Sequence, residues 1–302
     1  MGILVKADTR VLCFAPPGPD DQACSHCLER ARDAGTQVVG MVRPGEDAAR
    51  PAPCPLYPTA VQAVRDTGAN AALIHVQPGI ATDAMMEAID AGLPLIVCRT
   101  HGVPARDMVK VINYLQSSSD LSGPRHNEGR IWLLGPGSSG VIAPGTGMVG
   151  TFEPRLFRPG PVAIVSRSNC LAETAAQLLE QHHIGQSTCL VTSSALIVPT
   201  RLADVLGMLE ADPDTEVIVM IGGVGGYAEL EAADFVKEAV TKPIIAYLPG
   251  RSAPPGIDLG ANGDCASAGT AEIAHKAAAL RDAGVLVVPH IEDIVPAVAD
   301  RL

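Results

Sequence analysis

Two short motifs carry residue types that bind metals or attack substrates. Cys24-Ser25-His26-Cys27 is a Cys-x-x-Cys sequence, which together with a second such pair would predict a structural zinc site. The chain has no second pair, so small half-buried thiols on a helix are the preferred interpretation. Gly137-Ser138-Ser139-Gly140 lacks the Gly-x-Ser-x-Gly spacing of a nucleophile elbow and is interpreted as a turn. Neither motif predicts a catalytic centre, and no metal site is expected.

A glycine-rich segment near the C-terminus carries two further nucleophiles. In Gly260-Ala261-Asn262-Gly263-Asp264-Cys265, the carboxylate of Asp264 could form an acyl phosphate and the thiol of Cys265 could attack an electrophile. Both side chains are also typical of an ordinary loop on a glycine-rich turn. This structural interpretation is preferred over a catalytic one. They remain candidates only.

The composition excludes several classes of protein. The 22 Lys and Arg residues against 33 Asp and Glu residues give a net charge of -11, and the aromatic residues are one Trp, four Tyr and four Phe. A nucleic-acid-binding surface is not expected, because it needs excess cations or rings on which bases stack. No apolar run of about 18 residues predicts a membrane span. Eight cysteines without a disulfide framework favour reduced thiols in the cytoplasm.

The elements that must position any site alternate in type along the chain. Short Val- and Ile-rich runs alternate with segments of helical period, which is typical of βαβ units and parallel sheets. Ten runs are predicted as strands: 10–15, 37–43, 72–77, 94–99, 130–135, 161–166, 187–193, 216–222, 243–248 and 285–289. The sequence predicts two five-stranded α/β domains, residues 1–134 and 161–302, joined by a Gly- and Pro-rich connector, 135–160. Ligands are expected outside the carboxyl ends of such strands, where the strand order reverses.

Several local sequences occur in one order at consistent spacing. They are Glu87–Gly92 (EAIDAG), Gly135-Pro136 with Gly140–Ile142, Val165–Ser168 (VSRS), Gly185–Cys189 (GQSTC), Ala211–Pro213, and Met220–Gly222 with Gly225-Gly226. Together they resemble the α subunits of succinyl-CoA synthetase and malate–CoA ligase over nearly the whole chain. The resemblance implies a Rossmann-like CoA-binding domain followed by a flavodoxin-like ligase domain. It also implies CoA as the cofactor and an oligomer with a β subunit of the ATP-grasp type, or with another α-type chain.

In that family a histidine of the α subunit carries phosphate from the nucleotide to a carboxylate, and the CoA thiol then attacks the acyl phosphate. The resemblance implies that this histidine lies in a Gly-His-Ala-Gly segment, which Gly260–Gly263 matches. Ala261 holds the place of the histidine. A methyl group cannot carry phosphate, so the relay is expected to stop at this position unless Asp264 or Cys265 replaces the histidine.

The positions that cradle the phosphate in the family are altered as well. By resemblance they are Ser168, Asn169 and Cys170 at the start of one helix and Gly225 and Gly226 at the start of another. The glutamate that holds the family's histidine corresponds to Gly223. Glu173 replaces a tyrosine one turn into the first helix, where its carboxylate is expected to repel a phosphoryl group.

The positions that would contact CoA are, by the same resemblance, Gly18, Arg43, Thr100 and Ser138. The loop after the first strand offers backbone N–H groups to the CoA phosphates in the family. Here it contains Pro16-Pro17-Gly18-Pro19 and then two aspartates, which removes three N–H donors and adds repulsion. CoA binding is therefore expected to be weakened.

These observations favour a diverged α-like subunit of an acid–CoA ligase assembly that cannot form phosphohistidine and is non-catalytic or regulatory. One alternative is an active ADP-forming α subunit that uses a different phosphate acceptor. A second alternative is a stand-alone protein that binds another small ligand in the former CoA crevice.

Overall fold

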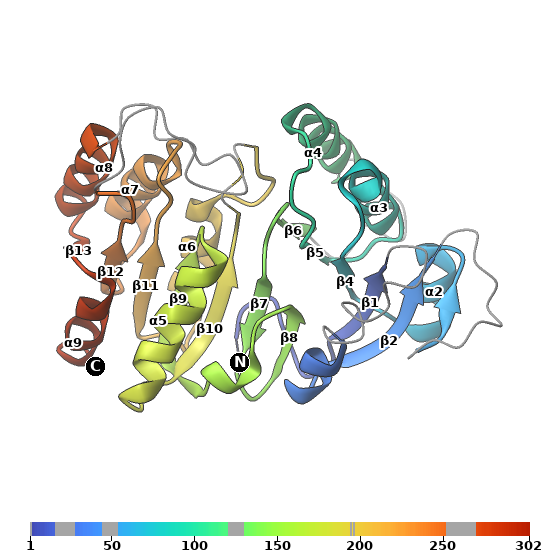
Figure 1. Cartoon of the computed structure of the whole chain (residues 1–302), viewed down its shortest axis with the longest axis horizontal. Coiled ribbons are helices and arrows are strands. Elements are labelled where there is room, and N and C mark those ends of the chain that lie inside the picture. Colours follow the sequence, from blue (N-terminus) through green and yellow to red (C-terminus); the bar gives the residue numbers. More distant parts are fainter. Residues whose placement is uncertain are drawn as a thin grey trace.

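The chain folds into two α/β units built around separate sheets (Figure 1). The computed structural model describes residues 2–15, 28–43, 54–119, 130–193, 195, 197–251 and 270–302. Both units have helices packed on a sheet of mostly parallel strands. The predicted fold class is confirmed by this arrangement.

The first sheet has six parallel strands in the order β3-β2-β1-β4-β5-β6. The strands are β1 (Arg10–Phe14), β2 (Gln37–Val42), β3 (Leu56–Tyr57), β4 (Ala71–Ile74), β5 (Leu95–Cys98) and β6 (Trp132–Leu134), and the helices are α2 (Ala60–Thr67), α3 (Pro78–Asp90) and α4 (Ala105–Ser119). This is the strand order of dinucleotide-binding domains. The order reverses between β1 and β4, so the crevice of this sheet lies beyond their carboxyl ends.

The second sheet has seven strands in the order β13-β12-β11-β9-β10-β7-β8. The strands are β7 (Gly140–Ala143), β8 (Gly147–Gly150), β9 (Pro159–Ser166), β10 (Gln186–Val191), β11 (Val217–Ile221), β12 (Ile244–Tyr247) and β13 (Leu286–Val288), and the helices are α5 (Asn169–Gln181), α6 (Leu202–Ala211), α7 (Ala228–Ala239), α8 (Thr270–Asp282) and α9 (Ile294–Ala299), with single 3-10 turns at Pro154–Leu156 and Ile291–Asp293. The five parallel strands follow the flavodoxin-like order, which reverses between β9 and β11.

The two sheets share one hydrophobic cluster. Leu73 of β4 and Val97 of β5 belong to the same buried cluster as Val149 of β8 and Leu190 of β10. Strands β9, β10 and β11 are almost wholly buried, as expected for parallel strands that helices cover on both faces. The face of the first sheet that carries Leu73 and Val97 is therefore turned toward the second unit.

All ten predicted strands are confirmed, but the prediction of five strands in each half is wrong. The two-residue β3 is too short to give a pattern. The stretch 135–160, expected as a connector, contributes the antiparallel pair of β7 and β8 to the second sheet. Its glycines are required because a Cβ at Gly140 would lie 2.0 Å from the carbonyl oxygen of Val149. The glycines that allow this close backbone approach give the hairpin the composition of a linker, and the two strands were therefore not predicted.

A glycine closes helix α2. Gly68 ends α2 in the left-handed conformation, and its N–H donates to the carbonyl of Val64. None of the helices in the described part of the chain is long and apolar enough to cross a membrane.

Candidate functional site

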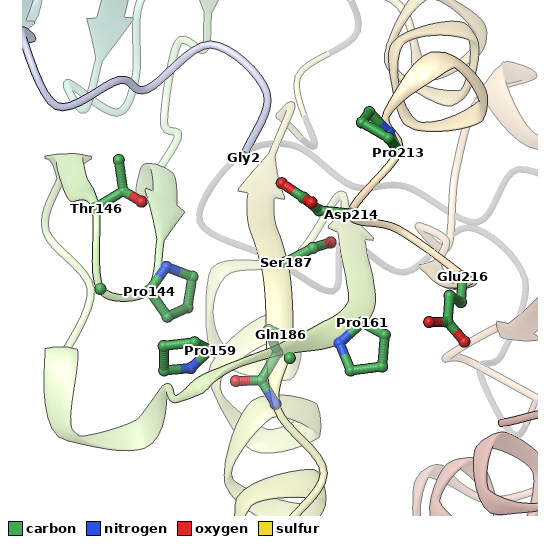
Figure 2. Close-up of a pocket in the computed structure, with 12 residues that line it drawn as sticks. Gly2, Pro144, Thr146, Pro159, Pro161, Gln186, Ser187, Pro213, Asp214 and Glu216 are labelled. Carbon is green, nitrogen blue, oxygen red and sulfur yellow. The ribbon is translucent and has the colours of Figure 1, made fainter.

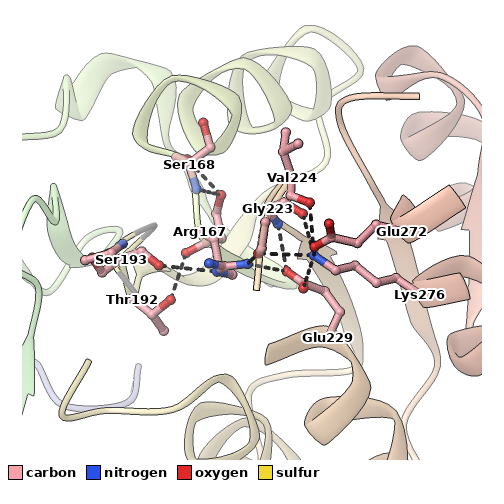
Figure 3. A network of polar contacts seen from close by, with 12 residues as sticks. Arg167, Ser168, Thr192, Ser193, Gly223, Val224, Glu229, Glu272 and Lys276 are labelled. Carbon is pink, nitrogen blue, oxygen red and sulfur yellow. Dashed lines mark hydrogen bonds and ion pairs between the residues drawn. The ribbon is translucent and has the colours of Figure 1, made fainter. Parts of the chain in front are cut away.

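The strand order of the second sheet reverses where two chemically distinctive segments meet. Arg167 follows β9 directly, and the glycine-rich loop Gly222–Gly226 follows β11. Both lie at the carboxyl end of the sheet, with the N-termini of α5 and α7 next in the chain. The topology therefore brings together the two predicted cradle segments (Figure 3).

A buried ion network lies beneath this loop. The Glu229 carboxylate is fully buried and accepts hydrogen bonds from Arg167 Nη1 at 2.9 Å and from the Gly223 N–H at 2.7 Å. Lys276 Nζ lies 3.0 Å from its other oxygen. Burial by itself would raise the pKa of Glu229, but the charges of Arg167 and Lys276 and the Gly223 N–H outweigh it, so the pKa is lowered. The carboxylate is therefore ionised, and both cations have a counter-ion.

The same cations hold the loop by its carbonyl groups. Lys276 Nζ donates to the carbonyl oxygens of Gly223, Val224 and Gly225 at 3.1 to 3.2 Å, and Arg167 Nη1 donates to that of Gly225 at 2.8 Å. Three successive carbonyls thus point to buried cations. In the described part of the chain, the N–H groups of residues 224–226 make no hydrogen bond. The loop is fixed with its acceptors inward and without help from a ligand.

Gly223 lacks the carboxylate of the family's glutamate, and its missing side chain also leaves space for Arg167. A Cβ at this position would lie 2.5 Å from Arg167 Nη1. The guanidinium occupies the space that any side chain at 223 would need, so the family's glutamate could enter only if Arg167 moved.

The N-terminus of α5 is tied to the segment after β6. Ser168 caps the helix, because its side chain accepts from the Leu171 N–H. Asn169 Nδ2 donates to the Gly137 carbonyl, and Asn169 Oδ1 accepts from the Ser139 N–H, both at 2.8 Å. Cys170 is exposed. The amide of Asn169 thus bridges the helix to a neighbouring loop.

The Glu173 carboxylate also has a defined partner. Its Oε1 accepts from the Glu153 N–H at 3.0 Å. The side chain is half-buried and is engaged with the segment after β8.

Thr100 and Ser138 lie together between the two sheets. The Gly137 N–H donates to the Thr100 carbonyl at 3.0 Å. Their hydroxyl groups are used within the protein: Thr100 Oγ1 donates to the Val76 carbonyl and Ser138 Oγ to that of Val191. Thr100 and Ser138, with Asn169 through Gly137, therefore form a structural seam between the units.

The remaining predicted site residues are elsewhere. Arg43 is buried just after β2, on the far side of β1 from β4, and its charge acts on Cys54. Gly18, Ala261, Asp264, Cys265 and the Cys24–Cys27 motif lie outside the described residues.

A basic cluster that was not predicted from the sequence lies at the switch point of the first sheet. His75 follows β4 and Arg99 follows β5. Arg99 Nη1 lies 3.3 Å from His75 Nε2, and Arg99 Nε donates to Thr151 Oγ1 at 3.1 Å. Burial lowers the pKa of His75, and the charges of Arg99 and His101 lower it further. The available signal was the position of both residues, directly after an apolar strand.

Three of the described thiols are poor nucleophiles. Burial raises the pKa of Cys98 to about 11 and raises those of Cys189 and Cys54. Among the residues that the structure describes, no group of three His, Cys, Asp or Glu side chains could hold a metal ion.

An open hollow of about 540 Å³ lies at the opposite, amino end of the second sheet (Figure 2). It is lined by residues 159–161 where β9 begins, by Gln186 and Ser187 where β10 begins, and by Asp214 and Glu216 before β11. Its described lining includes carboxylates but no Lys, Arg or His. The hollow is therefore unsuited to a phosphate or carboxylate ligand.

Comparison with known proteins agrees with the geometry. Residues 7–102 match the CoA binding domain family, and residues 159–299 match the family described as succinyl-CoA ligase like flavodoxin domain. The chain is 37% identical to the succinate–CoA ligase [ADP-forming] α subunit of Aquifex aeolicus, covering 100% of this chain and 95% of the relative. The chain belongs to the succinate–CoA ligase α-subunit family.

Other members of this α-subunit family and a solved structure are also similar. The malate–CoA ligase α subunit of Methylorubrum extorquens is 36% identical and covers 100% of this chain and 99% of its own. The structure of ATP citrate lyase from Methanothrix soehngenii with citrate and coenzyme A has a TM-score of 0.81 at 20% identity, covering 99% of this chain and 50% of that one. At that identity the likeness concerns the fold alone. The predicted family and fold are confirmed.

Proposed function

We propose that the chain is an α-type subunit of an acid–CoA ligase assembly that cannot form phosphohistidine and acts in a non-catalytic or regulatory role. The observation that carries the proposal is Ala261, at the place of the family's phosphorylated histidine. Its methyl group has neither a lone pair nor a leaving proton with which to accept a phosphoryl group. The family's transfer from nucleotide to carboxylate therefore has no carrier at this position.

The described scaffold supports the assignment to an α-type subunit. The loop Gly222–Gly226 is held by three buried charged side chains, so its conformation does not depend on the residue at position 261. The relatives at 36 and 37% identity are named as α subunits, and each is covered over nearly its full length. A chain that keeps this scaffold keeps the means to assemble with a β subunit of the ATP-grasp type.

The proposal extends to organisation and location. Residues 1–134 and 161–302 form the two domains, with 135–160 joining them and adding β7 and β8 to the second sheet. The assembly works in the cytoplasm, in keeping with free cysteines in the described residues.

Phosphoryl transfer to the chain tests the proposal. The purified chain is mixed with the ATP-grasp β subunit of the same source organism, assembly is followed by gel filtration, and γ-labelled ATP is added. We expect a complex in which the α-type chain carries no label. The Methylorubrum extorquens malate–CoA ligase with its own β subunit is the positive control.

Two outcomes would overturn the proposal. Acid-labile or hydroxylamine-sensitive label on this chain would show that another residue, such as Asp264, accepts the phosphate. Failure to form any complex with the β subunit would favour a stand-alone binding protein.

A further inference from the structure

The outer edge of the second sheet is covered by a side chain of the first unit. Strand β8 ends the strand order of this sheet. Thr36, which lies directly before β2 of the first unit, is only 5% exposed, and its Oγ1 donates to the Met148 carbonyl of β8 at 2.8 Å and accepts from the Met148 N–H at 2.7 Å. In a larger sheet the next strand would supply such bonds to an edge. One hydroxyl therefore takes the place of a neighbouring strand at this residue.

The backbone before Thr36 is fixed by the way the preceding helix ends. Residues 28–33 are helical, and Gly35 follows in the left-handed conformation at φ +86°. The Thr36 N–H donates to the Ala31 carbonyl and the Gly35 N–H donates to the Arg32 carbonyl, both at 2.9 Å. These two bonds form a Schellman motif, in which glycine adopts the left-handed conformation without a Cβ penalty. The local sequence thus places Thr36 before it meets the second unit.

The second unit is shaped to receive this segment (Figure 1). A Cβ at Gly147 would lie 3.3 Å from Thr36 Oγ1 and 3.3 Å from Val5, so a side chain there would crowd the contact. Ala31 is buried in the same hydrophobic cluster as Met148, although the two residues belong to different units. The helix over residues 28–33 therefore packs into the core of the second sheet as well as its own.

Arg30 makes a second contact with the same edge. Its Nη1 donates to the carbonyl of Thr151, which follows β8, at 3.1 Å, and its Nη2 lies 3.3 Å from Glu153 Oε2. The two charged side chains are 31% and 36% exposed, so their ion pair contributes little stability. The buried bonds of Thr36 are consequently the stronger polar link between this helix end and β8.

We propose that Thr36 is a positioning residue, which fixes the two units as one rigid body by acting in place of an edge strand on β8. A threonine hydroxyl is suited to this role because it donates and accepts at the same time. Both bonds are made within the chain, so the separation of the carboxyl ends of the two sheets is set before any ligand or partner binds. The proposal goes beyond the proposed function, because it requires neither a β subunit nor any chemistry at position 261.

Amide hydrogen exchange on the full chain tests the contact. Thr36→Val keeps the shape of the side chain and removes both bonds, whereas Thr36→Ser keeps the hydroxyl. Thr67→Val is the matched control, because Thr67 Oγ1 donates to the Ala63 carbonyl within α2 of one unit. We expect the Met148 amide to exchange at least about tenfold faster in Thr36→Val and at nearly the original rate in Thr36→Ser and Thr67→Val. An unchanged rate in Thr36→Val would overturn the proposal.

Residual dipolar couplings measured by NMR distinguish positioning from local stabilisation. We expect both units of the unmodified chain to share one alignment, and the alignments of the two units to differ in Thr36→Val. A shared alignment in folded Thr36→Val would show that Thr36 does not position the units. Two different alignments in the unmodified chain would also overturn the proposal, and that measurement does not depend on how well any variant folds. Either result leaves the label experiment on position 261 unaffected.

Discussion

Positively charged side chains have different partners at the carboxyl ends of the two sheets. At the second sheet, Arg167 is 6% exposed and Lys276 is 1% exposed, and both contact the carboxylate of Glu229. At the first sheet, Arg99 and His75 contact each other and a threonine hydroxyl, and no described carboxylate joins them. At the second sheet the loop Gly222–Gly226 is held by hydrogen bonds from these cations within the protein.

The two sites therefore differ in how their charged side chains are satisfied within the described part of the chain. The network beneath Gly222–Gly226 consists of contacts among described residues. The contacts of Arg99 with His75 and Thr151 are two hydrogen bonds without a described carboxylate. The first three predictions change the second site and its neighbourhood, and the last one changes the first site.

Replacement of Glu229 is expected to have the largest effect. Glu229→Gln removes the buried carboxylate that Arg167 and Lys276 share and leaves Lys276 with Glu272 at 3.7 Å, which is expected to lower the free energy of unfolding by about 3–5 kcal/mol. Chemical unfolding followed by circular dichroism measures the loss. Glu238→Gln, at an exposed position on the same helix, should change it by less than about 0.5 kcal/mol. Equal effects of the two variants would show that the network is not a buried ion cluster.

Replacement of Lys276 should cost less, because Glu229 keeps Arg167. Lys276→Met leaves three loop carbonyls without their shared donor, for an expected loss of about 2–3 kcal/mol. Amide hydrogen exchange should also accelerate in the loop Gly222–Gly226. The exposed Lys237 on α7 provides the matched control, Lys237→Met. Unchanged exchange in the loop would mean that Lys276 does not fix its conformation.

The bridge made by Asn169 is expected to be weaker. Asn169→Gly removes two neutral hydrogen bonds to the segment after β6, for a loss of about 1–2 kcal/mol. Thermal unfolding detects the change, and Ser139 and Gly137 should show the largest NMR shifts. A melting temperature equal to that of the unmodified chain would show that these hydrogen bonds of the seam do not stabilise the protein.

Replacement of His75 should have the smallest effect, which is a change in how the stability of the protein depends on pH below 6.5. The pKa of His75 is lower in the folded chain than its ordinary value of 6.5, so the unfolded chain binds a proton more readily as the pH falls. Its contribution is complete above pH 6.5 and is lost as the pH falls through the folded pKa. Because the ring is only half-buried, we expect His75→Phe to flatten the profile below pH 6.5 by less than about 1 kcal/mol. A steeper acid slope in the variant would reverse the assigned direction.

Much of the fold could be predicted from the sequence, because buried parallel strands are continuous apolar runs. Val217–Ile221 is such a run, and it is fully buried. The hairpin of β7 and β8 could not be predicted. Its glycines allow two backbones to approach closely, and that requirement produces no periodic pattern in the sequence. Local pattern identifies elements that bury side chains better than elements that bring backbones together.

The site was predictable only in part. The resemblance assigned Thr100 and Ser138 to the CoA contacts and Asn169 to the phosphate cradle. The structure brings these residues together, but the use of their side chains depends on neighbours far along the chain. Glu229 and Lys276 are 47 residues apart by number and lie on ordinary helical patterns, so their pairing depends on the packing of α7 against α8. No single-sequence pattern encodes such a pairing.

An NMR titration of the His75 ring tests most directly whether the charge of Arg99, which has no carboxylate partner among the described residues, acts on His75. The account predicts a pKa below 6.5 in the free chain, which rises toward the ordinary value in Arg99→Met. A pKa at or above 6.5 in the free chain, or one that Arg99→Met leaves unchanged, would contradict it.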